Sequence, residues 1–143
     1  MPPLLVTAAI IQREQSLLIT RRPAGSRQAG FWEFPGGKLE EGESPEQCLE
    51  REILEELGVQ SKVGSIFETV FYRYAWGDIL LLAYHCHLLE GAIRNLGVAE
   101  HRWVLPEHLD QFELLPADAP LVRKLQHTSS TSRLGTPTGR QKP

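Results

Sequence analysis

The segment GGKLEEGESPEQCLEREILEELGV, from Gly36 to Val59, holds eight glutamates in 24 residues. A glycine pair opens it and a helical pattern follows. Ser44 is suited to cap the helix, Pro45 fits its first turn, and Gln47 completes a capping box. Gly58 is placed to end the helix in a left-handed conformation. The segment therefore predicts a glycine turn that leads directly into a well-delimited acidic helix.

Two faces of this helix have different chemistry. An apolar stripe recurs every four residues, at Leu49, Ile53 and Leu57. Three carboxylates with spacing i, i+3, i+4 share a neighbouring face, at Glu52, Glu55 and Glu56. A solvated acidic face is the simpler interpretation, but these glutamates lack the lysine partners four residues away that solubilising pairs usually have. Because carboxylate and backbone oxygens suit Mg²⁺ or Mn²⁺, the face beside the glycine turn predicts a divalent metal site.

The composition excludes several other classes of protein. A chain of 143 residues fits one domain, and a net charge of −3 gives no reason to expect nucleic acid or a membrane surface as a partner. Cys48 and Cys86 are expected to be buried free thiols rather than a disulfide, because nothing indicates secretion. The N-terminus lacks the basic region and cleavage site of a signal peptide, and no apolar run reaches the roughly 18 residues of a membrane span. A cytoplasmic protein is expected.

The remaining sequence predicts a strand-rich domain with a second helix. Aliphatic and aromatic patterns predict strands at residues 4–11, 16–22, 62–74, 78–91 and 101–106. The first two form a hairpin, and a closing helix begins at Pro120. After His127 the chain is dominated by Ser, Thr, Gly and Pro, so residues 128–143 are expected to form a disordered tail.

The glycine turn and acidic helix carry a family resemblance. Every position of the Nudix box is matched, by Gly37, Glu43, Arg51, Glu52, Ile53, Glu55, Glu56, Gly58 and Val59. Flanking stretches resemble the MutT branch of the Nudix hydrolases, so the likeness covers about residues 4–126. It implies a Nudix hydrolase domain over residues 1–127, with a mixed β-sheet sandwiched between α-helices. It also implies hydrolysis of a nucleoside triphosphate to the monophosphate and pyrophosphate.

The resemblance also implies roles for the box residues. Glu52 and Glu56 correspond to the principal metal ligands, with Glu55 close by and the carbonyl of Gly36 contributing. Arg51 would orient the glutamates through charge-assisted hydrogen bonds. The metal, Mg²⁺ or alternatively Mn²⁺, would neutralise and orient the phosphates and activate water. Glu52 is the candidate general base.

One position departs from the family pattern. MutT-type proteins commonly carry another acid six positions before the tryptophan that is here Trp103, and that position is Gly97. The nearest acid is Glu100, which is either a further metal ligand or a solvent-exposed loop residue. Glu43 is expected to support the loop or a metal-bound water.

Besides Asp118, four residues outside the box are candidates for substrate binding. Arg22 matches a phosphate-contacting position of the family, and Arg27 is either a second such residue or an exposed charge. Glu33 matches a position near the nucleoside, and burial among its aromatic neighbours would raise its pKa. Tyr74 is either a residue that stacks on the base or a core residue.

Asp118 bears on the choice of base. It occupies the position of an asparagine in relatives specific for oxidised guanine, whose amide accepts from N7–H and donates to O6 of 8-oxoguanine. An ionised aspartate can only accept, whereas a protonated one restores both bonds. A carboxylate also suits the exocyclic amine of cytosine. The other interpretation is that Asp118 caps the following helix.

These observations leave three functional hypotheses. The first is an 8-oxo-dGTP diphosphatase that cleanses the nucleotide pool, and the second is a pyrophosphohydrolase of CTP, dCTP or 5-methyl-dCTP. The third is a non-catalytic nucleotide-binding module, which the complete box disfavours. The nucleoside triphosphate is the expected partner, without direct binding of nucleic acid or membrane, and the protein is expected to be a monomer or homodimer.

Overall fold

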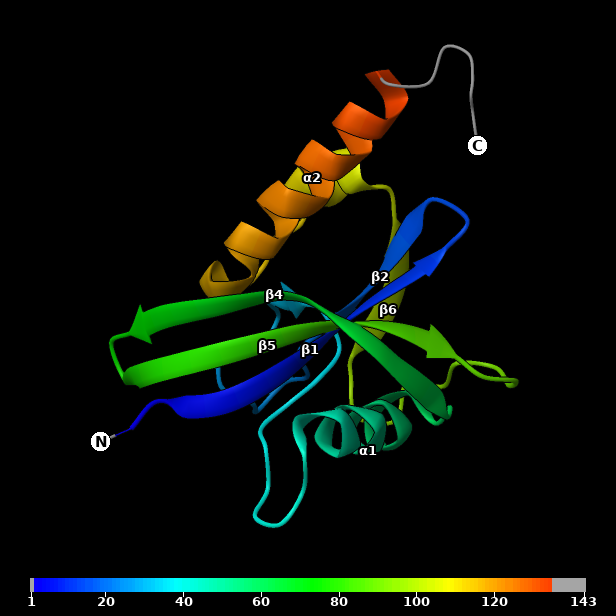
Figure 1. Cartoon of the computed structure of the whole chain (residues 1–143). Helices are drawn as coiled ribbons and strands as arrows, with labels where there is room; N and C mark the ends of the chain where they lie inside the picture. Colours follow the sequence, from blue (N-terminus) through cyan, green and yellow to red (C-terminus); the bar gives the residue numbers. More distant parts are fainter. Residues whose placement is uncertain (1, 135–143) are drawn as a thin grey trace.

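A mixed β-sheet lies between two helices, with α1 on one face and α2 on the other, as the sequence predicts (Figure 1). The computed structural model describes residues 2–134. Its strands are β1 (Leu4–Arg13), β2 (Ser16–Arg21), β3 (Trp32–Glu33), β4 (Ser61–Tyr74), β5 (Gly77–Leu88) and β6 (Glu100–Val104). Its helices are α1 (Pro45–Leu57) and α2 (Ala119–Leu134), with 3₁₀ helices η1 (Pro106–Gln111) and η2 (Pro116–Asp118).

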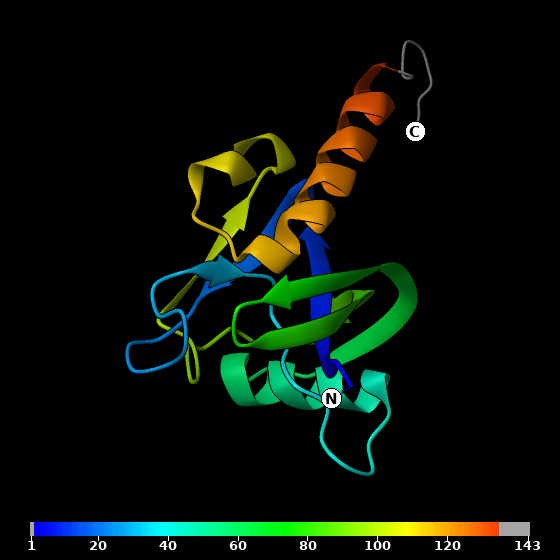
Figure 2. The same ribbon diagram turned by 90° about the vertical axis from the view of Figure 1, so that its left-hand side faces the viewer.

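The sheet divides into two halves that are joined at the β1–β2 hairpin. β1 pairs in parallel with β5, which pairs antiparallel with β4. β2 pairs with β3 and β6 but with β1 only at the hairpin end, where Gln12 lies opposite Leu17. Where β2 departs from β1, the segment 35–39 hydrogen-bonds to β1 in its place. The glycine turn is therefore fixed to the central strand of the domain (Figure 2).

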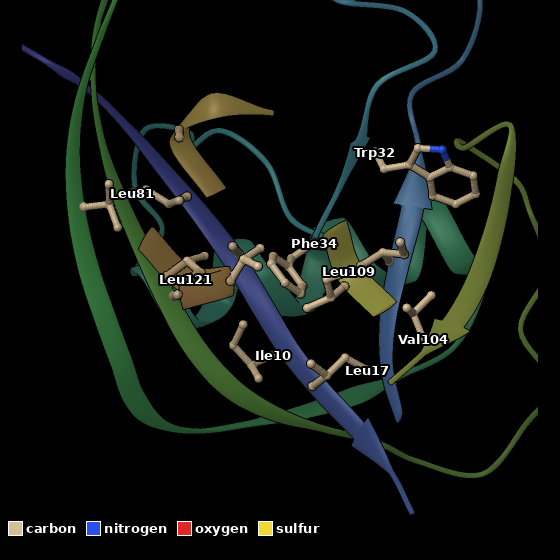
Figure 3. Packing of buried hydrophobic residues seen from close by; sticks show 14 of the residues in the cluster. Ile10, Leu17, Trp32, Phe34, Leu81, Val104, Leu109 and Leu121 are labelled. Atoms are coloured by element: carbon tan, nitrogen blue, oxygen red, sulfur yellow. The ribbon is translucent and has the colours of Figure 1, made fainter. Parts of the chain in front are cut away.

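β1 supplies both hydrophobic cores. Side chains alternate along a strand, so successive residues face opposite sides of the sheet. Ala8 and Ile10 belong to the cluster that contains Leu121 of α2, and Ala9 and Ile11 belong to the cluster formed with α1. Figure 3 shows Ile10 and Leu121 in the first cluster. The apolar stripe predicted for α1 is confirmed, because Leu49, Ile53 and Leu57 are all fully buried.

The predicted ends of α1 are also confirmed. The hydroxyl of Ser44 accepts from the backbone N–H of Gln47 at 3.1 Å, and the Gln47 side chain accepts from the Ser44 N–H at 2.9 Å. Gly58 is left-handed, with φ of 68°, and its N–H donates to the Leu54 carbonyl. Both ends of the acidic helix are thus fixed locally by the chain itself.

The end of α2 differs from the prediction. The helix continues to Leu134, past His127, where the sequence indicates the start of a disordered tail at residue 128. No glycine or proline occurs between Leu121 and Leu134, so nothing in this stretch breaks the helix despite its polar composition. Residues 135–143 of the predicted tail lie outside the described residues.

Two smaller predictions are confirmed by the structure. Cys48 and Cys86 are both buried and free. Within residues 2–134, no helix has the length and apolar character needed to cross a membrane.

Candidate active site

The glycine turn is pressed against β1. The Gly37 carbonyl accepts from the Thr7 N–H at 2.8 Å, the Gly37 N–H donates to the Thr7 carbonyl at 3.1 Å, and the Pro35 carbonyl accepts from Ala9. A Cβ atom on Gly36, whose φ is 152°, would overlap the Thr7 carbonyl oxygen. One on Gly37 would overlap the carboxyl group of Glu52. A side chain on Gly36 would therefore collide with the backbone of β1. A side chain on Gly37 would displace the carboxyl group of Glu52.

Glu52 and Glu56 form an acidic pair beside this turn. The two carboxyl groups are close enough to share a hydrogen bond, and the Gly36 backbone also lies within reach of Glu56. Burial, together with the charges of Glu33 and Glu52, raises the pKa of Glu56 to about 9. Burial also raises the pKa of Glu52. Without a cation the pair therefore retains a proton at neutral pH.

Arg51 connects the loop before α1 to the helix itself. Its Nε and Nη2 donate to the two oxygens of Glu43 at 3.0 and 2.7 Å, and Nη1 lies 3.1 Å from Glu52 and 3.2 Å from Glu55. Nη2 also donates to the Lys38 carbonyl. The hydrogen bonds from Arg51 lower the pKa of Glu43 to about 2. Arg51 therefore links Glu43 and the Lys38 carbonyl of the loop to Glu52 and Glu55 of α1.

The acidic pair has the chemistry that a divalent cation requires. Two hard oxygen ligands that share one proton can exchange it for a metal ion, which restores the missing positive charge. Glu55 is placed differently, because its side chain is 60% exposed and pairs with Arg51. Among residues 2–134, no three acidic, histidine or cysteine side chains converge on one point. The described geometry is thus a carboxyl pair beside the Gly36 backbone, not a three-carboxylate cage.

The structure separates Glu100 from this pair. Glu100 lies in β6 and forms ion pairs with Arg21 and Arg102, both at 3.2 Å. Gly97, in contrast, lies next to the pair, because its N–H donates to the Glu56 carbonyl at 3.0 Å. The position that carries an acid in related proteins is therefore adjacent to Glu56 but has no side chain, and Glu100 does not take its place in this geometry.

A cavity of about 400 Å³ opens beside the acidic pair. It brings together most of the predicted site residues, namely Arg22, Arg27, Glu33, Gly36, Glu52, Glu56, Tyr74 and Asp118. This volume suits a small-molecule ligand. Residues from β1, the glycine turn, α1, the β4–β5 hairpin and η2 thus contribute to one site.

Arg22 and Glu33 form an ion pair within the cavity. Nη1 of Arg22 lies 3.0 Å from Glu33, and its Nε donates to the Arg27 carbonyl at 2.6 Å. Burial raises the pKa of Glu33 despite this partner, as its aromatic setting predicts. Arg22 is thus fixed between a carboxylate and the loop that carries Arg27.

Asp118 is almost completely buried in η2. Its Oδ2 accepts from the Phe34 N–H at 3.3 Å, and only 5% of the residue is exposed. Burial, and next the charge of Glu33, raise the pKa of Asp118 well above its ordinary value. The hydroxyl of Tyr74 accepts from the N–H of Ala117, the residue before Asp118. Asp118 is therefore a buried cavity residue in the last turn before α2, rather than a side chain exposed at the helix start.

The sequence left the apolar wall of the cavity unassigned. Leu80, Leu82 and Tyr84 could be placed either in the cavity or in the core. Leu82 and Tyr84 pack toward α1, and the wall instead contains Ile79 and Leu81. Side chains alternate along β5, so Leu82 and Tyr84 face one side of the sheet and Ile79 and Leu81 face the other. Only the packing of β5 on β1 decides which of these two faces lines the cavity. Trp76, at the hairpin tip, also lines the cavity, and its position between two long strands was the only signal for it.

The raised pKa of Glu56 predicts a pH-dependent stability. Between its ordinary value of 4.5 and about 9, the folded chain holds a proton that the unfolded chain has lost. The free energy of unfolding of the metal-free protein should therefore fall as the pH rises through this window. A bound divalent cation replaces the proton, so its stabilising effect should grow with pH.

Thermal unfolding measured near pH 6 and near pH 9, with EDTA or with excess MgCl₂, checks this expectation. The rise in Tm caused by Mg²⁺ should be larger near pH 9. Glu50→Gln, an exposed change on the same helix, is the control and should leave the difference unchanged. A Mg²⁺ effect that is equal at both pH values would contradict the prediction.

Comparison with known proteins defines the class. A model of the NUDIX domain matches residues 1–125. The chain belongs to this family and is a Nudix hydrolase, as the box predicts.

Related proteins are named for two different activities. A CTP pyrophosphohydrolase of Escherichia coli K12 is 42% identical over 120 residues, which cover 82% of this chain and 87% of the relative. An 8-oxo-dGTP diphosphatase of the same organism is 34% identical over 127 residues, covering 88% and 98%. Nudix hydrolases generally use divalent metal ions and act on nucleotide substrates.

Solved structures support the fold. The solution structure of the E. coli ORF135 protein matches with a TM-score of 0.76 and 36% identity, covering 96% of each chain. The MutT protein of Methanosarcina mazei Go1 matches with a TM-score of 0.79 over 90% of this chain, at 24% identity. The predicted fold class is confirmed.

Proposed function

We propose that the protein is a Mg²⁺-dependent nucleoside triphosphate pyrophosphohydrolase, and that 8-oxo-dGTP is its preferred substrate. The products are the nucleoside monophosphate and pyrophosphate. The observation that carries the choice of substrate is the burial of Asp118, which raises the pKa of its carboxyl group, in the same cavity as the Glu52–Glu56 pair. Such an activity would remove oxidised guanine from the nucleotide pool before replication.

The roles of the chain's residues follow from their positions. Glu52 and Glu56 would hold Mg²⁺, or Mn²⁺ in its place, with the carbonyl of Gly36. The ion would supply charge neutralisation of the phosphates and activation of water. Arg51 fixes Glu52 in position, and Arg22 lines the cavity where it can donate to phosphate oxygens. Glu55 and Glu100 are predicted ligands that lie outside the pair, so they rank below it.

The raised pKa of Asp118 favours its neutral form, and in that form it can recognise a base. A neutral carboxyl group presents one donor and one acceptor side by side. 8-Oxoguanine offers the complementary pair, an acceptor at O6 and a donor at N7–H. Guanine offers two acceptors at the same positions, so one of them meets the carbonyl oxygen of Asp118 and a hydrogen bond is lost. Discrimination between these two bases is the expected result.

A second candidate substrate is CTP or dCTP. The 42% identity to a CTP pyrophosphohydrolase favours it. Cytosine also presents an acceptor, N3, beside a donor, the N4 amine, so the same neutral Asp118 suits its edge. A neutral Asp118 therefore suits both 8-oxoguanine and cytosine, and turnover must decide between them.

Pyrophosphate release with Mg²⁺ tests the proposal across 8-oxo-dGTP, dGTP, CTP, dCTP, 5-methyl-dCTP and ATP. A kcat/KM for 8-oxo-dGTP that exceeds the value for dGTP at least about tenfold, and exceeds that for CTP, is the expected result. A preference for the cytosine nucleotides would establish the second candidate. Binding without turnover of any member would indicate a non-catalytic module.

Substitutions of Asp118 test how the base is read. Asp118→Asn keeps one donor and one acceptor and cannot ionise, so the preference for 8-oxo-dGTP over dGTP should be retained or increased. Asp118→Ala removes both groups and should lower that preference about tenfold or more. Asp110→Ala, at an exposed aspartate of η1, is the control. A ratio that Asp118→Ala leaves unchanged would remove Asp118 from base recognition.

The remaining expectations concern the cellular setting. A substrate drawn from the free nucleotide pool is consistent with a cytoplasmic protein that does not bind nucleic acid directly. A monomer or homodimer remains the prediction for the assembly.

A further inference from the structure

An aromatic and cationic cluster lies at the cavity, where the β4–β5 hairpin meets the loop after β2. Its members are Trp76, Tyr74 and Arg27, and all three line the cavity. Trp76 lies in the turn between β4 and β5 and is 44% exposed, although large aromatic side chains are usually more buried. An exposed tryptophan beside a ligand-sized cavity calls for a physical role.

The indole of Trp76 contacts two other side chains that line the cavity. The rings of Trp76 and Tyr74 are stacked, with centroids 5.1 Å apart and an angle of 8° between their planes. The guanidinium carbon of Arg27 lies 4.0 Å from the Trp76 centroid, a close cation–π contact. The hairpin and the loop are thus joined by the flat face of one side chain.

This stack is tied to the base-reading end of the cavity. The Tyr74 hydroxyl accepts from the N–H of Ala117 at 3.1 Å, and Ala117 directly precedes Asp118. The orientation of the stack relative to Asp118 is therefore fixed by a hydrogen bond. A base whose edge faces Asp118 would have its flat face available for contact with these rings.

The backbone of Arg27 is hydrogen-bonded to Arg22, the other arginine of the cavity. Its carbonyl accepts from Nε of Arg22, whose Nη1 pairs with Glu33. A guanidinium group and a nucleobase are both planar, and both bind to the face of an indole. The Arg27 guanidinium therefore occupies a surface on which a nucleobase would stack.

We propose that Trp76 is a nucleotide-binding residue of this site, and that the nucleobase takes the place of the Arg27 guanidinium on its indole face. The displaced guanidinium remains on a loop that lines the cavity and becomes available to the phosphates. Base stacking and phosphate neutralisation are then coupled. The nucleobase that stacks on Trp76 releases the Arg27 guanidinium, which can then bind the phosphates of the same nucleotide. This inference rests on the proposed nucleotide substrate and extends it to a residue outside the Nudix box.

Steady-state kinetics with the best nucleotide of the panel test the proposal. Trp76→Ala should raise KM about tenfold and change kcat less than about threefold, since stacking contributes to binding rather than to bond cleavage. Trp76→Phe keeps a flat ring and should restore most of the affinity. Trp103→Phe is the matched control, because Trp103 carries the same kind of contact, with Arg13 at 4.3 Å, outside the cavity.

Tryptophan fluorescence gives a readout that does not depend on turnover. The nucleoside monophosphate product, titrated in EDTA, should change the emission of the wild-type protein and of Trp103→Phe, but not that of Trp76→Phe. An emission change that survives in Trp76→Phe, or an unaltered KM in Trp76→Ala, would overturn the inference. Because the titration needs only binding, it separates this inference from the proposed activity. Turnover with an unaltered KM in Trp76→Ala would leave the proposed function intact.

Discussion

Glu56→Gln should lower kcat by about 10³-fold or more without unfolding the protein. The substitution removes one of two carboxyl groups that can hold a divalent ion, and metal charge contributes several kcal/mol to transition states of phosphate chemistry. Folding should be preserved because burial keeps the pKa of Glu56 at about 9. Near neutral pH the metal-free side chain is already uncharged, so a neutral glutamine amide of similar size is a close replacement.

Two measurements make this prediction sharp. Pyrophosphate release in saturating Mg²⁺ gives kcat, and thermal unfolding in EDTA near pH 7 should give a midpoint close to that of the wild type. Glu50→Gln, the same chemical change on an exposed position of α1, should leave both quantities unchanged. Retained turnover in Glu56→Gln would contradict the assignment of the acidic pair as the metal site.

Gly37→Ala is expected to have an effect of similar size, for a steric reason. A Cβ atom on Gly37 would overlap the carboxyl group of Glu52. That group is the end of a flexible side chain, so it can move aside and the fold can persist. Its displacement would separate Glu52 from Glu56, and the loss of kcat should reach about 10²-fold or more. Affinity for Mg²⁺, measured by calorimetry, should fall in parallel.

The neighbouring glycine offers a contrasting control. A Cβ atom on Gly36 would overlap the carbonyl oxygen of Thr7, which belongs to the backbone of β1 and cannot move aside. Gly36→Ala should therefore lower the free energy of unfolding, whereas Gly37→Ala should leave it nearly unchanged. Equal losses of stability in the two variants would show that Gly37→Ala acts on the fold rather than on Glu52.

Features determined by neighbouring residues were predicted well from the sequence. The start and end of α1 depend on Ser44, Gln47 and Gly58, whose side chains or backbone act within one helical turn. The two faces of α1 follow from spacing alone. The family resemblance of the box then indicated the class of enzyme, because a glycine turn and a spaced set of glutamates form a strongly constrained pattern.

Features that depend on long-range packing were not predicted. Asp118 becomes buried because η2 packs against Phe34, 84 residues away in the chain. The contact of Arg27 with Trp76 likewise joins two loops that are remote in sequence. Glu100 was a reasonable candidate by position, but its pairing with Arg21 is set by the register of β6 on β2. Such partners are outcomes of the assembled sheet.

The attachment of the glycine turn to β1 has a consequence for how this protein can change. β1 carries side chains of both cores and also hydrogen-bonds to Gly37, against which Glu52 rests. A substitution in either core that shifts β1 would move the turn, and with it the acidic pair. The stability of the fold and the activity of the site therefore both depend on the position of β1. Mutations that improve the packing of Ile10 or Ile11 should preserve activity only when they leave the backbone position of β1 unchanged.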